Sequence, residues 1–199
     1  MCFTPFAIAV PASSPFKTLP ELLSFLGQNQ GVANYGSPGV YSIHQLSLEM
    51  LLQLGANAQH IPYQGGLTML GNLLQQRLTF GVLSVQLAQK YVRQQQMPVL
   101  AVTGATRSPQ MPDVLALSKT YPGFSTASTA YLMAAPGMEP CFIQSDHDIM
   151  AATHDQQRFA SKAGRCRHGR RYENNVEASW LIRQETEHWG QILRHVGGD

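Results

Sequence analysis

Short apolar runs alternate with longer amphipathic runs along the first hundred residues, and this alternation is the strongest constraint on the fold of the chain. The runs at 6–10, 32–36, 59–62, 78–82 and 98–103 predict strands, and the segments at 18–28, 42–55, 67–76 and 85–96 predict helices. At the first of these helices, Thr18 can act as the N-cap, with Pro20 in the first turn. Strands that alternate with helices indicate an α/β layered fold with a mainly parallel sheet.

Composition limits the classes of protein that need to be considered. The chain has 199 residues, of which 44% are hydrophobic and 13% charged, and its net charge is +2. No apolar run is long enough to cross a bilayer, so we expect no direct membrane insertion. The three cysteines, Cys2, Cys141 and Cys166, form no CxxC pair, which indicates free thiols and no metal site.

The basic residues gather late in the chain, with six of them in the fourteen residues 158–171, "RFASKAGRCRHGRR". Clustered arginines can contact nucleic-acid phosphates, so a nucleic-acid patch is one interpretation of this segment. No aromatic platform accompanies the cluster, and the rest of the chain carries little charge. We therefore expect no nucleic-acid partner.

Two strand-to-helix junctions are rich in small residues: "YGSPGVYS" at 35–42 and "PYQGG" at 62–66. Ligands of open α/β sheets bind outside the carboxyl ends of the strands, and helix N-termini there present unpaired N–H groups. A carboxylate or a phosphate is the natural partner of such groups. The alternative is two ordinary turns, with Ser42 acting only as a helix cap.

The motifs "NYGSPGVYSIHQL", "HIPYQGG", "LAVTGATRSPQMPDV", "AAPGMEP" and "LIRQETEHWGQIL", in this order, resemble the substrate-binding receptors of tripartite tricarboxylate transporters, which are also called Bug-type periplasmic solute-binding proteins. The resemblance implies a receptor that closes on a small carboxylated solute and hands it to membrane transporter subunits. It implies no cofactor and no enzymatic activity. It also implies a periplasmic location; we recognise no signal peptide, and without one the chain would stay in the cytoplasm.

The resemblance implies a two-lobed fold, the periplasmic-binding-protein type 2 or Venus-flytrap fold. Residues 1–127 would form lobe two, nearly complete, and residues 128–199 would return to lobe one as an incomplete remnant. We expect 155–179 to be irregular and basic. Because the family begins with half of lobe one, the chain looks N-terminally truncated, and both a binding receptor and a non-functional copy stay open.

The resemblance also implies which residues hold the carboxylate. The candidates at the first junction are Tyr35, Gly36, Ser37, Gly39, Ser42 and His44, and those at the second are Tyr63, Gly65 and Gly66. Some have alternative roles: His44 and Tyr63 could be packing residues, and the two serines could be helix caps.

The chain departs from the family pattern near both junctions. Tyr41 stands where the family commonly has glycine, and a ring there could narrow the place where the carboxylate is expected to bind. Gln64 replaces a common lysine, and Leu83 and Ser84 replace a polar pair.

An enzyme is the competing functional class, in the form of a small hydrolase-like α/β protein. The sequence has no G-x-S-x-G elbow and no cysteine in a recognised nucleophile context. His147, Asp148 and His154 lie close together in sequence, but their segment reads as a helix with solvated polar residues. We therefore expect no catalytic residue.

Overall fold

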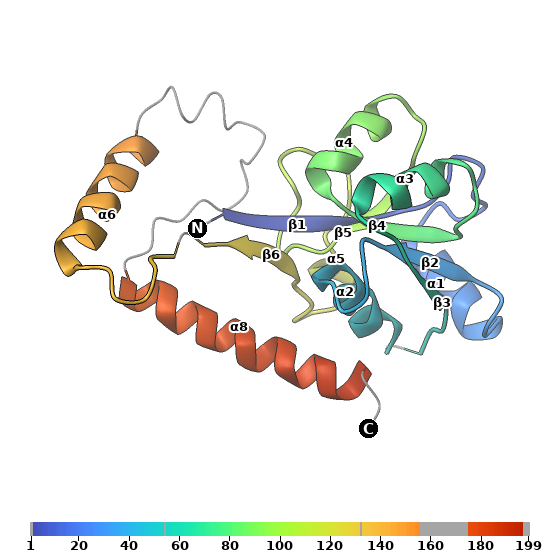
Figure 1. Ribbon diagram of the computed structural model, residues 1–199. Coiled ribbons are helices and arrows are strands. Elements are labelled where there is room, and N and C mark those ends of the chain that lie inside the picture. Colours follow the sequence, from blue (N-terminus) through green and yellow to red (C-terminus); the bar gives the residue numbers. More distant parts are fainter. Residues whose placement is uncertain (1, 54, 132, 156–174, 197–199) are drawn as a thin grey trace.

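The structure, a computed structural model, describes residues 2–53, 55–131, 133–155 and 175–196 (Figure 1). In chain order, its elements are β1 (Cys2–Ala9), α1 (Leu19–Gln28), β2 (Asn34–Ser37), α2 (Ile43–Leu52), β3 (Gln59–Pro62), α3 (Gly66–Leu74), β4 (Phe80–Ser84), α4 (Val85–Arg93), β5 (Val99–Val102), α5 (Leu117–Thr120), β6 (Ala127–Ala130), α6 (Pro140–Asp155) and α8 (Asn175–Val196). All five predicted strands and all four predicted helices of the first hundred residues are present.

The strands form one sheet in the order β3-β2-β4-β1-β5. β2 runs parallel to β3 and to β4, whereas β1 runs antiparallel to β4, β5 and β6. Among the strands that the structure describes, only β1 therefore opposes the common direction. The sheet is rich in parallel strands, as predicted, with one reversed strand inside it.

β1 serves two parts of the molecule. Its second half, Phe6–Ala9, lies between β4 and β5, whereas its first half, Cys2–Pro5, pairs with β6. Thr103 ties these parts together, since its hydroxyl accepts from the Phe6 N–H at 3.0 Å and donates to the Thr126 carbonyl at 2.7 Å. β1 thus leads from the α/β body toward the region of α6 and α8 (Figure 1).

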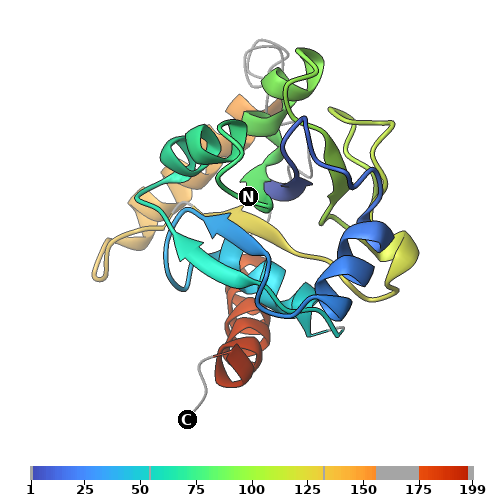
Figure 2. The ribbon, with the colours of Figure 1, turned by 90° about the vertical axis from the view of Figure 1, so that its right-hand side faces the viewer.

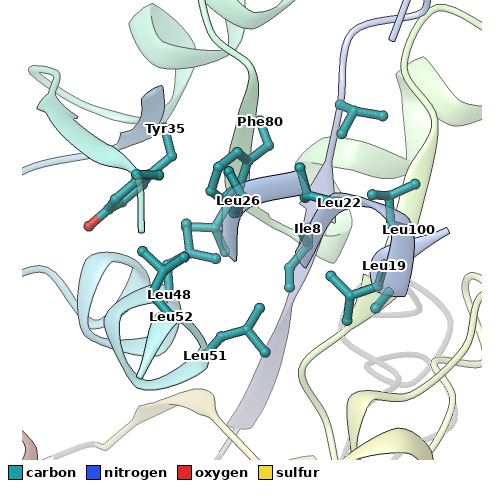
Figure 3. Close-up of a cluster of buried hydrophobic side chains, with 14 of the residues drawn as sticks. Ile8, Leu19, Leu22, Leu26, Tyr35, Leu48, Leu51, Leu52, Phe80 and Leu100 are labelled. Carbon is teal, nitrogen blue, oxygen red and sulfur yellow. The ribbon is translucent and has the colours of Figure 1, made fainter. Parts of the chain in front are cut away.

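Helices cover both faces of the sheet, as the two views show (Figures 1 and 2). On β1, Phe6 and Ile8 face the cluster that includes side chains of α1 and α2, whereas Ala7 and Ala9 face the cluster of α3 and α4. Figure 3 shows the first cluster, with Ile8 and Phe80 from the sheet against leucines of the two helices. This alternation is the period-two pattern of a strand buried on both faces.

The N-cap predicted for α1, Thr18, is present, with Pro20 in the first turn. The Thr18 hydroxyl accepts from the Glu21 N–H at 3.4 Å, and the Glu21 carboxylate accepts from the Thr18 N–H at 3.3 Å, which completes a capping box. Three helices end earlier than predicted: α2 at Leu52, α3 at Leu74 and α4 at Arg93. A residue with left-handed backbone follows each of them: Gly55 (φ 104°), Gln76 (φ 61°) and Gln95 (φ 55°).

The predicted irregular segment 155–179 is partly corrected. Asp155 ends α6, and residues 175–179 already lie in α8, whose helical periodicity reaches further back than expected. The rest of that segment, including the basic run, lies outside the described residues. The assignment of 1–127 and 128–199 to two lobes stays a prediction.

α8 packs against α2. Hydrogen bonds also join α8 to β6 and to Tyr131, which follows β6 directly. The Glu185 carboxylate accepts from the Thr129 hydroxyl at 2.5 Å and from the Tyr131 hydroxyl at 3.0 Å. Partial burial, and then these contacts with Glu185, raise the pKa of Tyr131 to about 12. The long helix is therefore anchored to the body by a charged group with two donors.

Candidate functional site

Three helices begin at one edge of the sheet. β2, β3 and β4 are parallel neighbours, and α2, α3 and α4 start after their carboxyl ends. The junctions touch: the Gly65 N–H donates to the Pro38 carbonyl at 3.1 Å, and a Cβ atom on Gly66 would lie 3.6 Å from Leu87 and 4.0 Å from Pro38. The two glycine-rich loops therefore meet at this edge, and the start of α4 joins them.

Ser37 organises the β2–α2 turn from inside. Its hydroxyl is fully buried and lies 2.8 Å from both the Gly39 carbonyl oxygen and Nε2 of His60. The carbonyl can only accept, so the single hydroxyl proton goes to Gly39, and Nε2 of His60 carries the hydrogen donated to Ser37. The Ser42 hydroxyl caps α2 by accepting from the Gln45 N–H at 3.3 Å, and it lies 3.5 Å from the Ser37 hydroxyl oxygen.

Tyr35 and Gly36 lie in the core of the sheet. The Tyr35 ring is buried between His60 and Phe80, at centroid distances of 4.9 and 5.6 Å, and its hydroxyl donates to the Glu49 carboxylate. Burial and this carboxylate raise the pKa of Tyr35. Both residues lie in β2, directly before the first junction, and pack within the sheet. Any contact of these residues with a ligand stays a prediction.

Gly36 is required for packing. An added Cβ atom would lie 2.6 Å from both Met69 and Leu78. Gly81, in the adjacent strand, would place a Cβ atom 3.0 Å from the Met69 sulfur. The two glycines pair across β2 and β4, and together they make room for Met69 of α3.

The second junction is built around Tyr63 and Gly65. The Tyr63 N–H donates to the Ser37 carbonyl at 3.0 Å, which extends the β2–β3 pairing by one residue. Gly65 has φ 96°, a backbone conformation that side chains rarely adopt, and its carbonyl accepts from the Met69 N–H at the start of α3. The Tyr63 ring is partly buried and packs near Gly36.

His44 lies in the first turn of α2 and is partly buried. Its ring centroid is 4.3 Å from that of Phe6, whose strand neighbour is Ser84. Burial lowers the pKa of His44 to about 4, so the imidazole is neutral at neutral pH. His44 therefore packs against Phe6, as the alternative interpretation of this residue expects. Because Phe6 pairs with Ser84 at the end of β4, His44 also lies near the helix starts.

Tyr41 has a left-handed backbone, with φ 56°, and its side chain is 61% exposed. Its N–H donates to Oε1 of the buried Gln45 at 2.7 Å. This contact holds the turn in a left-handed conformation that suits glycine better than a residue with a side chain.

Charge is absent from the three junctions. The segments 34–48, 60–76 and 78–89 contain no Asp, Glu, Lys or Arg. The groups they present to an anion are hydroxyls and the first N–H groups of three helices, which have no acceptor within their own helix. Aligned N–H groups and helix dipoles favour a carboxylate or another anion at such an edge.

Two residues of this edge were missed as site residues. Ser84 was noted only as a departure, yet its hydroxyl caps α4 by accepting from the Leu87 N–H at 3.4 Å. His60 holds Ser37 through the parallel register that sets it beside Tyr35. The position of Ser84 between a strand and a helix is a signal that the sequence contains. The role of His60 is visible only once the register of β2 and β3 is known.

The described residues give little support to the alternative functions, a hydrolase or a nucleic-acid-binding protein. His147 and Asp148 lie on α6, and Nδ1 of His147 is 3.5 Å from a carboxylate oxygen of Asp148. Among the described residues, no group of three His, Cys, Asp or Glu side chains could hold a metal, and no helix is both long and apolar enough to cross a membrane. His154 and the arginines of 158–171 have no described side-chain environment.

The fold defines a class: an α/β body with a parallel-rich sheet and helices on both faces, as in one lobe of the periplasmic-binding-protein fold. The sequence pattern of the tripartite tricarboxylate transporter family receptor matches residues 1–197. The chain belongs to this receptor family.

Individual relatives are distant in sequence. The UPF0065 protein in the gbd 5' region of Cupriavidus necator is 26% identical over 193 residues, which are 96% of this chain and 59% of that protein. A UPF0065 protein of Bordetella pertussis is 31% identical over 101 residues, or 50% of this chain and 31% of the relative. The chain therefore spans less than two thirds of the length of each of these two relatives.

Solved structures share the fold. An R. palustris protein, Rpa4515, solved with adipate, superposes with a TM-score of 0.89 at 21% identity, covering 99% of this chain and 67% of that one. The periplasmic binding protein BugD gives a TM-score of 0.86 at 18% identity, covering 98% and 67%. MatC from Rhodopseudomonas palustris, with bound malate, gives a TM-score of 0.82 at 18% identity, covering 97% of this chain and 67% of MatC.

Proposed function

We propose that this protein is an extracytoplasmic receptor that binds a small carboxylated solute at the edge where α2, α3 and α4 begin. The observation that carries the proposal is the contact among three uncharged junctions, each followed by a helix N-terminus. Main-chain N–H groups there can donate hydrogen bonds to a carboxylate without the help of a cationic side chain. Adipate and malate, which two proteins of the same fold bind, are carboxylates of this kind.

The candidate residues divide into two groups in this proposal. Gly39, Ser42, His44, Gly65 and Gly66 lie at or beside the helix starts and would surround the carboxylate. Tyr35, Gly36 and Ser37 would support them from within the sheet, and Tyr63 would lie between the groups. Ser84, at the start of α4, joins the first group.

The partners follow from the family. The receptor would deliver its solute to membrane subunits of a tripartite transporter, and it would do so in the periplasm. Binding requires no cofactor and no chemical change of the solute.

Thermal unfolding with and without solute, combined with an assay of the solute, tests this proposal. Millimolar mono- and dicarboxylates should raise the melting temperature, and the solute should remain unchanged after prolonged incubation. Matched concentrations of chloride control for ionic strength. An unchanged melting temperature with every acid, or consumption of the acid, would contradict a receptor function.

A further inference from the structure

The edge that carries the three helix starts also carries exposed apolar side chains. Among the side chains described between residues 4 and 131, four large hydrophobic ones are exposed: Val32, Val40, Tyr41 and Leu67. The last three lie in the β2–α2 turn and the first turn of α3, and only Val32 lies at the opposite end of β2. Apolar exposure in the α/β body is therefore concentrated at the candidate site.

These three side chains belong to junctions that are bonded to each other. Val40 and Tyr41 follow Pro38, whose carbonyl accepts from the Gly65 N–H at 3.1 Å, and Leu67 follows Gly66, which lies beside Pro38. Their exposed fractions are 58% for Val40, 61% for Tyr41 and 71% for Leu67. We call Val40, Tyr41 and Leu67 the apolar rim.

The position of Tyr41 is fixed by the backbone. Its left-handed φ of 56° and the 2.7 Å bond from its N–H to Gln45 hold the residue directly before the cap of α2. The buried Gln45 thus holds the backbone of Tyr41 in an unfavourable conformation just before α2, and the residue stays exposed there.

The chemistry of the rim points to a class of solute. A carboxylate can bind at the helix starts, and around them the three junctions carry no Asp, Glu, Lys or Arg side chain. Apolar side chains instead suit an apolar stretch attached to the carboxylate.

Resting on the proposed function, we propose that the apolar rim selects acids whose carboxylate is joined directly to an unsubstituted apolar stretch, an alkyl chain or an aromatic ring, over compact polycarboxylates such as citrate. The carboxylate would bind at the helix starts, and the apolar stretch would lie against Tyr41 and Leu67.

Dissociation constants of the full chain for acetate, butyrate, hexanoate and citrate, measured by ligand-observed NMR, test this inference. A fully buried methylene improves affinity about fourfold and a half-buried one about twofold. We expect hexanoate to bind at least about tenfold more tightly than acetate, with citrate no tighter than acetate. The variants Tyr41→Ala and Leu67→Ala should each flatten this series, because they weaken hexanoate binding more than acetate binding. Val32→Ala, the matched control at the opposite end of β2, should leave the series unchanged.

The outcomes separate the two proposals. If acetate, hexanoate and citrate bind with similar affinity, the inference about the rim is wrong and the receptor proposal stands. If the series is steep but Val32→Ala flattens it as much as the rim variants do, the rim does not select the solute. If no acid binds, both proposals are wrong.

Discussion

The Ser37 hydroxyl lies 2.8 Å from Nε2 of His60, and this contact joins the β2–α2 turn to strand β3. Ser37 is fully buried, so its replacement by alanine would leave the His60 N–H without this acceptor. We expect Ser37→Ala to lower the free energy of unfolding by about 1–3 kcal/mol, measured by urea titration. Ser24→Ala on the exposed side of α1 should change it by no more than about 0.5 kcal/mol. Equal effects of both substitutions would contradict a structural role for the pair.

Tyr41 pays a conformational penalty that glycine would not. Because its φ is 56°, Tyr41→Gly should be more stable than Tyr41→Ala by about 1 kcal/mol, since both remove the ring and only glycine relieves the backbone. Urea unfolding of the two variants measures this difference. If alanine is as stable as glycine at this position, the turn is not held in the left-handed conformation.

Gly36 has no room for a side chain. With Met69 and Leu78 each 2.6 Å from an added Cβ atom, Gly36→Ala should destabilise the protein by about 1–3 kcal/mol. The matched control is Gly71→Ala in α3, where nothing lies within 4 Å of the new atom. That substitution should stabilise the protein by about 0.5–1 kcal/mol, because alanine is the better helix former. Thermal unfolding distinguishes these opposite signs, and a neutral Gly36→Ala would contradict the packing.

Acid should destabilise the protein through His44. Burial lowers its pKa from 6.5 to about 4, so the unfolded chain binds more protons than the folded one between these values, and stability falls as the pH falls. The loss from this group reaches about 3 kcal/mol. Its ring signals in NMR should titrate near pH 4, and His44→Gln should reduce the stability difference between pH 7 and pH 4.5. A ring titration near pH 6.5 would contradict the burial.

Local pattern predicted the elements of the body but not the direction of every strand. The capping box of α1 depends on Thr18 and Glu21, three residues apart, and is therefore readable from sequence. The reversal of β1 is not, because strand direction follows from how the chain crosses between parts of the molecule. A segment such as "FAIAV" has the same pattern in either direction.

The candidate site divides in the same way. The glycine of the second junction could be anticipated at Gly65, where the turn requires a positive φ. The bond between Ser37 and His60 could not, because it depends on the register of two strands that are 23 residues apart in the chain at this contact. The resemblance implies a ligand contact for Gly36, and this stays a prediction. The packing of Gly36 against Met69 and Leu78 is a separate role that only the tertiary structure displays.

Chemical-shift mapping with a carboxylate tests most directly whether the three helix starts form one anion site. Butyrate should shift the backbone amide signals of Gly39, His44, Gly66 and Val85 together, with one dissociation constant, whereas butanol, which has the same apolar chain without the charge, should shift them far less. Shifts confined to one junction, shifts with different dissociation constants at the three junctions, or shifts centred on Lys90 and Arg93 would contradict a shared carboxylate site.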